Sequence, residues 1–329
     1  MASLENDMAE AILNQPQFQD ADKAREHLES LRWPHGPVCP HCGSVRAPLK
    51  LEGKSYRPGL FKCNDCYEQF TVTVGTVFER SKIALNIWLQ AVHLMCASKK
   101  GISAKQLERM LGVTYKTAWF MAHRIREAMY DEIAGPLGGS GKVVEADETY
   151  WGSEGGSKAN AAKADGRKNG RALKDSNKVV ALVERGGKVR AFHVPSVTGQ
   201  NLKMVLQSQI HPDTHVMTDS SPRYNLFKRE NGFKAYDQIN HSKAEYVRGN
   251  VHTNTVEGFF SIFKRGLVGT FHHVAPKHLQ RYSNEFAFRY NSRTALGFDD
   301  TDRANLALKG IAGKRLTYRR IGEQQVPNA

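Results

Sequence analysis

The sequence lacks any long hydrophobic run, and it contains few cysteines. No stretch of its 329 residues approaches the roughly 20 apolar residues that a membrane-spanning helix needs. The acidic start, MASLENDMAEAILNQ, has no basic segment followed by an apolar core, so it is unlike a signal peptide. We therefore expect a cytoplasmic protein without a membrane partner. In that reducing compartment, five cysteines indicate metal ligands rather than disulfides.

Acidic residues are also scarce relative to basic ones. There are 33 Asp and Glu against 47 Lys and Arg, which gives a formal net charge of +14. Such an excess attracts polyanions, so nucleic acid is the leading candidate partner and an anionic membrane surface a weaker one. The hydrophobic content of 40% is that of a globular protein, and the length suits two or three domains.

Four of the cysteines form two CxxC pairs at the spacing of a zinc ribbon. Cys39 and Cys42 make the first pair, and Cys63 and Cys66 make the second. Four thiolates satisfy the tetrahedral preference of Zn²⁺, so we predict one structural Zn²⁺. Residues 70–78 (FTVTVGTVF) alternate as a β-hairpin strand would. The zinc either stabilises a small fold alone or also supports a DNA-contacting surface, and these alternatives are compatible.

Residues 103–126 have the pattern of a helix-turn-helix. Ser103 and Thr114 are suitable N-caps, and Gly112 can supply a left-handed turn residue between the two helices. In a DNA-binding unit the start of the second helix would meet base edges and its basic residues would meet phosphates. The candidate DNA-binding residues are Tyr115, Lys116, Thr117, Arg124 and Arg126. The alternative is a plain helical hairpin with a solvated basic face.

The second half begins after the flexible segment GPLGGSG (residues 135–141) and predicts an alternation of strands and helices. Expected strands cover residues 142–150, 178–184, 188–194, 214–219 and 233–239. Expected helices cover residues 200–210, the segment from Pro222 and the segment from Asn254. The order β-β-β-α-β-α-β-α is that of an RNase H-like fold with a mixed five-stranded sheet. Residues 152–176 are rich in Gly, Lys and Ala and predict a basic loop of unassigned role.

Three acids occur where this fold would support metal chemistry. Asp147 lies in the first strand, Asp219 at the end of the fourth, and Glu257 at the start of the last helix. Oxygen ligands suit Mg²⁺ or Mn²⁺, and two such ions can activate a nucleophile and stabilise a leaving 3′-oxygen. We therefore predict a site for two ions on these carboxylates. Strand alternation places Glu145 on the face of Asp147 and Glu148 on the opposite face.

Each acid also has a purely local interpretation. Asp147 could be a solvated charge, and Asp219 before Ser-Ser-Pro could start a turn. Glu257 follows Asn254 by three residues, the spacing of a capping box. Against this, Glu257, Ser261 and Lys264 fall on one helix face, so Lys264 could direct its ammonium toward a phosphate near the metal site. Its alternative is an ordinary surface lysine.

Several longer motifs resemble those of bacterial insertion-sequence transposases with an N-terminal zinc ribbon and an integrase-like DDE domain. They are LRWPHGPVCPHCG (31–43), FTVTVGTVFE (70–79), VEADETYWG (144–152), HTNTVEGFFSIFKRG (252–266), GTFHH (269–273) and LQRYSNEFAFRYNSR (279–293). The resemblance covers roughly residues 25 to 295.

The resemblance implies that Asp147, Asp219 and Glu257 are the three metal-binding acids and that Lys264 is the lysine that follows them. In some relatives the third acid is Asn or His, which makes Asn254 a possible alternate third ligand. It also implies a nucleoid-associated enzyme that frees 3′-hydroxyls at the element's ends and joins them to target DNA. Double-stranded DNA is then the partner, and two or more protomers would pair the two ends.

Two other functions remain open from the residues alone. One is a zinc-ribbon and helix-turn-helix regulator with an inert RNase H-like domain; the other is a nuclease that hydrolyses DNA without joining it. The complete set of acids with Lys264 favours the transposase over the regulator. The expected organisation is multidomain, α+β and α/β: an N-terminal helical segment (1–35), zinc ribbon (36–80), helix-turn-helix region (81–135), catalytic domain (142–295) and a tail (296–329). The basic tail is either a DNA-contacting arm or a solvated end, and of the two we expect the solvated end.

Overall fold

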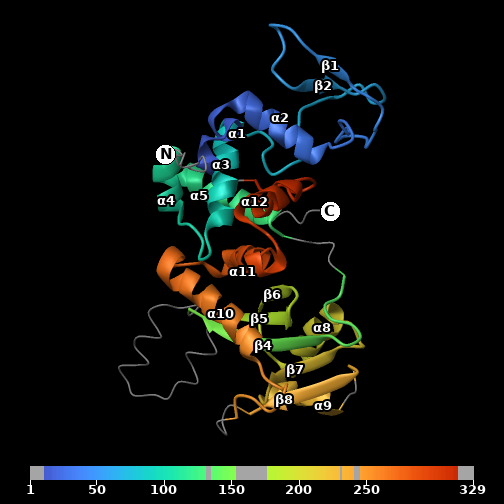
Figure 1. The fold of residues 1–329 in the computed structure, drawn as a ribbon, viewed down its shortest axis with the longest axis vertical. Helices are drawn as coiled ribbons and strands as arrows, with labels where there is room; N and C mark the ends of the chain where they lie inside the picture. Colours follow the sequence, from blue (N-terminus) through green and yellow to red (C-terminus); the bar gives the residue numbers. More distant parts are fainter. Residues whose placement is uncertain (1–10, 131–134, 153–175, 230–231, 241–244, 318–329) are drawn as a thin grey trace, which may run out of the picture. The chain divides into compact units, whose positions relative to one another are not determined.

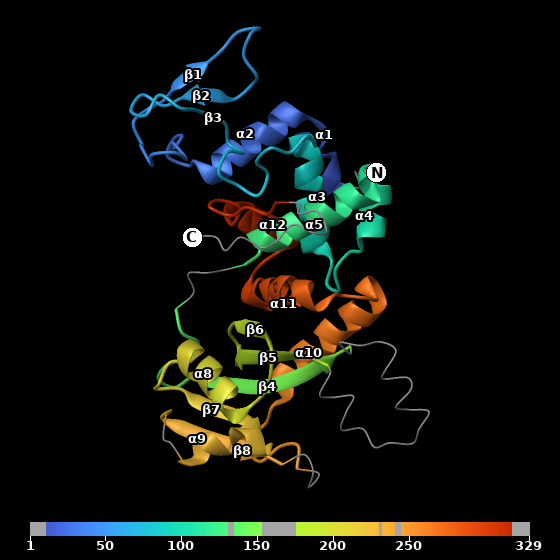
Figure 2. The same cartoon turned by 180° about the vertical axis from the view of Figure 1, so that it is seen from behind.

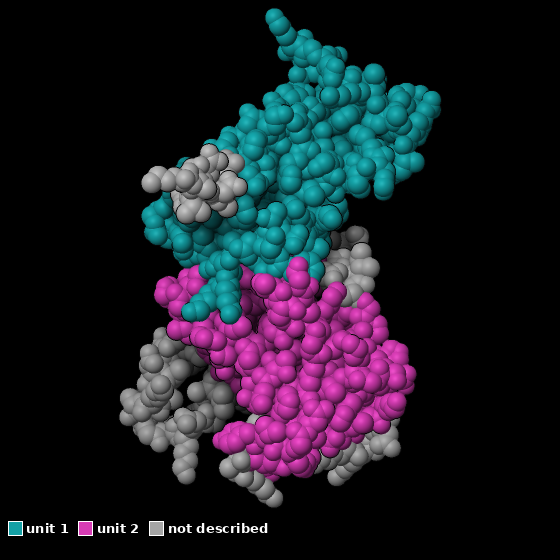
Figure 3. Space-filling view, viewed as in Figure 1, with its two compact units in different colours: residues 1–129, 298–329 teal, residues 130–297 magenta. Residues whose placement is uncertain are grey.

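The computed structural model describes residues 11–130, 135–152, 176–229, 232–240 and 245–317, and the predicted basic loop falls outside them (Figure 1). The chain divides into two units, which Figure 3 distinguishes by colour. Unit 1 comprises residues 1–129 and 298–329, and unit 2 comprises residues 130–297. No helix among the described residues is long and apolar enough to cross a membrane.

Unit 1 begins with short helices that lead into the ribbon. A 3-10 turn (Ile12–Asn14), α1 (Pro16–Gln19) and α2 (Ala21–Arg32) follow one another, and Asp20 caps α2 by accepting the backbone N–H groups of its first turn. The ribbon is an antiparallel sheet of β1 (Leu49–Leu51), β2 (Leu60–Lys62) and β3 (Gln69–Phe70). Trp33, Phe61 and Phe70 pack together beneath it.

The prediction of a strand over residues 70–78 is wrong beyond Phe70, where β3 ends. Turns follow β3, and Gly75 has a φ of 69° that an extended strand does not allow. The carbonyls of Val72 and Val74 accept hydrogen bonds from Arg32 Nη1 instead of from a neighbouring strand. The β-branched residues are therefore accommodated by burial in a turn-rich segment, in which Thr76 forms an isolated bridge with Ala312.

The helix-turn-helix geometry predicted for residues 103–126 is confirmed. Helices α4 (Ala104–Leu111) and α5 (Tyr115–Ala128) flank Gly112, whose φ is 65°. Ser103 and Thr114 cap them by accepting the N–H groups of Gln106 and Thr117. Both helices pack with α3 (Leu85–Ala97).

The C-terminal segment corrects our expectation of a solvated end. Residues after 297 form α12 (Asp300–Lys309), which starts with a capping box and packs against α2, α3 and α5 of unit 1. Ala307, Leu308 and Ile311 are buried, and Arg303 donates to the carbonyl of Cys96 in α3. This part of the tail belongs to the core of unit 1.

Unit 2 has the predicted RNase H-like fold. Its five strands are β4 (Val143–Trp151), β5 (Asn177–Glu184), β6 (Val189–Val194), β7 (His215–Asp219) and β8 (Ala235–Ile239). Their spatial order is β6-β5-β4-β7-β8, with β4 antiparallel to β5 and parallel to β7 (Figure 2). The Gly-Gly hairpin between β5 and β6 is also confirmed.

Helices cover both faces of this sheet. One face packs on α8 (Gly199–Gln209), the 3-10 turn η2 (Pro222–Tyr224) and α9 (Asn225–Arg229). The other face packs on α10 (Asn254–Gly266) and α11 (Pro276–Asn291). A π-helical turn, Leu267–Phe271, continues α10, and a 3-10 turn, Thr294–Leu296, follows α11. Because side chains alternate along a strand, odd-numbered residues of β5 face α10 and even-numbered ones face α8.

Candidate active site and zinc site

The pairing of β4 with β7 places Asp147 and Asp219 side by side. The two parallel strands pair as far as Ala146 with Thr218, and the two aspartates are the next residues on each. Neighbouring strands lie about 4.8 Å apart. Val144, Ala146 and Val216 pack on the α8 face, so both aspartates project toward the face that carries α10.

Glu257 comes to the same face through the docking of α10 on β4. The helix begins at Asn254, and its first-turn N–H groups from Thr255 and Val256 donate to Glu145 Oε2 at 2.8 and 3.0 Å. A capping box between Asn254 and Glu257 is therefore wrong, because Thr253 occupies the N-cap position and its hydroxyl donates to Glu257 Oε1 at 3.0 Å. Glu257 thus has a local contact with the N-cap residue, although not the capping box that the sequence suggested.

The electrostatics of Asp147 report the proximity of the acids. Burial raises the pKa of Asp147 to about 7, with further contributions from the charges of Glu148, Asp219 and Glu257. The backbone N–H of Glu148 donates to Asp147 Oδ1 at 2.8 Å and acts in the opposite direction. The nearby carboxylates thus disfavour ionisation of Asp147, and a divalent cation bound beside it would relieve that repulsion.

This pKa predicts a pH-dependent cost to stability. The folded-state pKa lies above the unfolded value, so stability falls as the pH rises from about 4 to about 7 and stays lower above that. We expect Asp147→Asn to raise the free energy of unfolding of unit 2 at pH 8 in metal-free buffer by on the order of a few kcal/mol, and hardly at pH 4.

Urea unfolding at both pH values measures this difference. Asp213→Asn, at an exposed aspartate of the same unit, serves as the matched control. Equal stabilisation by Asp147→Asn at pH 4 and pH 8 would contradict the assignment of the cost to carboxylate ionisation.

The exposed side of α10 carries the other residues predicted for this site. Asn254, Glu257, Ser261 and Lys264 are all exposed and follow the helical repeat. Lys264 lies seven residues after Glu257, about 10 Å along the axis, so it stands two turns away from the end of α10 that bears Glu257. Asn254 lies in the same turn as Glu257 and remains a candidate third ligand.

The segment after Asp219 is held by Glu148 on the opposite face of the sheet. Asp219 Oδ1 accepts the N–H of Ser221 at 3.1 Å, so this aspartate does also stabilise the turn that its local interpretation predicted. Tyr224 and Arg223 of the 3-10 turn donate to the Glu148 carboxylate at 2.7 and 2.6 Å. Burial, followed by the charge of Glu148, raises the pKa of Tyr224, so its hydroxyl remains a donor.

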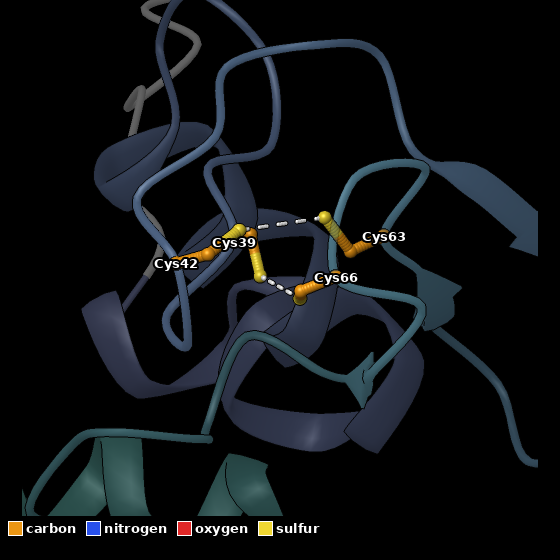
Figure 4. Close-up of side chains that lie close together, drawn as sticks. All are labelled: Cys39, Cys42, Cys63 and Cys66. Carbon is orange, nitrogen blue, oxygen red and sulfur yellow. Dashed lines mark hydrogen bonds between the residues drawn. The ribbon is translucent and has the colours of Figure 1, made fainter.

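The four predicted zinc ligands meet in the ribbon (Figure 4). Their sulfur atoms all lie within 4.8 Å of one another, with Cys39 to Cys66 at 3.6 Å and Cys42 to Cys63 at 3.7 Å. Four sulfurs at about 2.3 Å from a tetrahedral Zn²⁺ would be about 3.8 Å apart, whereas a disulfide would need about 2.05 Å. The thiols fit zinc.

Backbone donors favour the thiolate form of Cys63. The N–H groups of Cys66 and Asp65 lower the pKa of Cys63 to about 6. The fifth cysteine, Cys96, is buried in α3, as its apolar surroundings predict. Among the described residues, these four cysteines are the one group of three or more His, Cys, Asp or Glu whose ligand atoms all approach this closely.

The candidate DNA-binding residues of α5 divide into two groups. Tyr115 and Lys116 are exposed at the helix start, where Lys105 lies 5.2 Å from the Tyr115 ring, and Thr117 is partly exposed beside them. The expected phosphate contacts of Arg124 and Arg126 do not fit the structure, because both side chains are buried. Their end of α5 is enclosed by α3 and α12, and Arg124 donates to the Glu79 carbonyl at 2.6 Å.

Three residues of the site had no role in the sequence-based prediction. Arg185 binds Glu145. Glu145 in turn binds the start of α10, which bears Glu257, and Glu148 binds the turn that follows Asp219. The strand alternation indicated the faces of the two glutamates. Nothing local indicated Arg185, which lies in the β5–β6 hairpin turn, 40 residues after Glu145.

Comparison with known proteins agrees with this architecture. Residues 136–291 match the ISXO2-like transposase domain, and residues 19–69 match the transposase zinc-ribbon domain. A protein of Halobacterium salinarum, named as an uncharacterized protein in transposable element ISH50, is 29% identical over 260 residues, which are 76% of this chain and 84% of that protein. The resemblance inferred from the motifs is confirmed.

Proposed function

We propose that this chain, which carries a transposase zinc ribbon and an ISXO2-like transposase domain, cuts and joins DNA as the transposase of an insertion sequence. The observation that carries the proposal is the placement of Asp147 and Asp219 as neighbours on parallel strands. The helix bearing Glu257 packs on the same face of the sheet.

In this proposal the three carboxylates hold two Mg²⁺ or Mn²⁺ ions. Bound there, the ions would activate the attacking oxygen and stabilise the leaving 3′-oxygen. Asp147 and Asp219 fix their oxygens from rigid strands, so their separation changes little when DNA binds. The third ligand is Glu257 or, in the same helical turn, Asn254. Lys264 pairs with a phosphate farther along the DNA strand.

Two successive displacements at phosphorus account for the reaction. In the first, water attacks the phosphodiester at the element's end; the P–O3′ bond breaks, giving a 3′-hydroxyl and a 5′-phosphate. In the second, that 3′-hydroxyl loses its proton and attacks a target phosphate, releasing a 3′-hydroxyl on the target. Each step exchanges one P–O bond for another, so no covalent enzyme intermediate is needed. Pairing two ends requires two or more protomers.

Binding of the terminal inverted repeats is assigned to the start of α5. We expect Lys116→Ala to weaken binding to end DNA and to lower the slope of log K against log salt by about 1, as the loss of one phosphate contact predicts. Fluorescence anisotropy across a salt series measures both. Lys309→Ala, at an exposed lysine of α12, is the matched control, and equal losses in the two variants would count against a role for α5.

The whole proposal is tested with labelled DNA that carries the element's own ends, a supercoiled plasmid target and Mg²⁺. The expected products are end fragments nicked at their 3′ side and covalent joints between the label and the plasmid. Nicking without joining would favour a hydrolytic nuclease. Specific binding with neither reaction, under Mg²⁺ and Mn²⁺ alike, would favour the regulator.

A further inference from the structure

Glu145 is a buried carboxylate whose partners converge from two other segments. Its side chain is 0% exposed, although it lies only two residues before Asp147 on β4. Besides the two N–H groups of α10, it accepts the Thr255 hydroxyl at 2.9 Å and Arg185 Nε at 2.5 Å. An anion at a helix N-terminus is favourable because the first-turn N–H groups otherwise lack acceptors.

Arg185 extends this contact to the segment that leads into α10. Its Nη1 donates to both the carbonyl and the side-chain oxygen of Asn250, at 2.8 and 3.0 Å, and its Nη2 donates to the carbonyl of His252 at 2.9 Å. Because Arg185 follows β5 directly, it ties the start of α10 to the β4–β5 pair. The segment before the helix and the first turn of the helix are thus held by one ion pair.

The consequence is a fixed relation between two of the proposed metal ligands. Glu145 and Asp147 project from the same face of β4, about 7 Å apart along the strand. Glu145 binds the amides of Thr255 and Val256, and Glu257 is the next residue of the helix. The Glu145 contact therefore determines where Glu257 stands relative to Asp147.

We propose that Glu145, paired with Arg185, is a positioning residue that sets the metal-binding geometry by holding α10 against β4. This inference rests on the proposed function, since it concerns the same metal site. A buried ion pair by itself adds little net stability compared with apolar packing. Here three of the four hydrogen bonds to Glu145 come from α10, and the segment before the helix supplies oxygen acceptors to Arg185. The arrangement fits control of ligand position better than general stabilisation.

Glu145→Gln is the primary test, because it keeps the shape and removes the charge. An amide NH₂ would then face donors from α10 or Arg185. We expect the Mn²⁺ concentration for half-maximal binding, measured by calorimetry without DNA, to rise by about 10- to 100-fold, as is usual when the residues behind metal ligands are changed. Amide hydrogen exchange of Thr255 and Val256 should accelerate in the same variant, while affinity for end DNA stays unchanged.

Glu184→Gln is the matched control. Glu184 also accepts a backbone N–H, from Gly138, and lies near Lys142. In the part of the chain that the structure describes, no hydrogen bond or ion pair joins it to α10 or to an acid of the site. The proposal is overturned if Glu145→Gln leaves Mn²⁺ binding within twofold of wild type, or if Glu184→Gln weakens it equally. Failure of the wild type to cut DNA while it binds Mn²⁺ in this Glu145-dependent way would reject the proposed function alone.

A second variant keeps the inference testable if Glu145→Gln does not fold. Thr255→Val is isosteric and removes only the hydroxyl bond to Glu145. We expect it to weaken Mn²⁺ binding several-fold and to accelerate exchange at the first turn of α10. Unchanged Mn²⁺ binding in a folded Thr255→Val variant, with Glu145→Gln unfolded, would assign Glu145 to folding and overturn the proposal.

Discussion

Replacement of Asp147 or Asp219 by asparagine is expected to lower both strand cleavage and strand joining by about 10³-fold or more. An amide keeps the shape of the side chain but removes the charge that holds a divalent ion, and metal stabilisation of transition-state charge is worth several kcal/mol, at about 1.4 kcal/mol for each tenfold in rate. Single-turnover rates on pre-cut and uncut end DNA measure joining and cleavage separately.

A matched control separates chemistry from folding and binding. Asp213→Asn removes a charge from the same unit at an exposed position and should leave both rates unchanged. Both active-site variants should still bind end DNA, because α5 belongs to the other unit. Wild-type joining by Asp147→Asn or Asp219→Asn would show that the acids are wrongly assigned.

The same assay decides between Glu257 and Asn254 as the third ligand. Both are exposed on the first turn of α10, and neither takes part in a capping box. We expect Glu257→Gln to cause a loss comparable to that of Asp219→Asn, and Asn254→Ala to cause a much smaller one. The reverse ranking would assign the third position to Asn254.

The order of elements in unit 2 could be predicted because each element has a strong local signal. The hydrophobic strands, the Gly-Gly turn and the proline after Asp219 all specify their own structure, and the strand order then brings Asp147 beside Asp219. The polar contacts that hold the first turn of α10 could not be predicted. They depend on Arg185 and Glu145, whose contact joins residues 40 apart and leaves no periodic pattern.

The errors in unit 1 have the same origin in tertiary contacts. Residues after Phe70 have strand-like composition, yet Arg32 of α2 satisfies their carbonyls. Arg124 looks like a surface cation in the sequence, yet it is buried over the rings of Trp88 and Phe120 and donates to the Glu79 carbonyl. Local sequence predicts helices and turns well, but it does not show which charged side chains a distant segment will cover.

The zinc ribbon should lose its fold when its metal is removed. Its strands have three, three and two residues, too few to be stable in water by themselves. Binding of Zn²⁺ by four thiolates contributes about 10–16 kcal/mol in small zinc domains, and most of that becomes folding free energy. We expect Cys63→Ser, or treatment with a strong chelator, to release the zinc and expose residues 36–80 to protease while unit 2 stays protected.

Elemental analysis before and after treatment should give one zinc per chain and then none. Cys96→Ala, at the cysteine buried in α3, is the matched control and should keep its zinc. A protease-resistant ribbon after complete zinc loss would contradict the metal-dependent fold. If the zinc-free protein keeps its affinity for end DNA, the ribbon has a structural role alone. If the affinity is lost, the ribbon contributes to DNA binding, and its exposed Lys50, Lys54 and Arg57 are the candidate contacts.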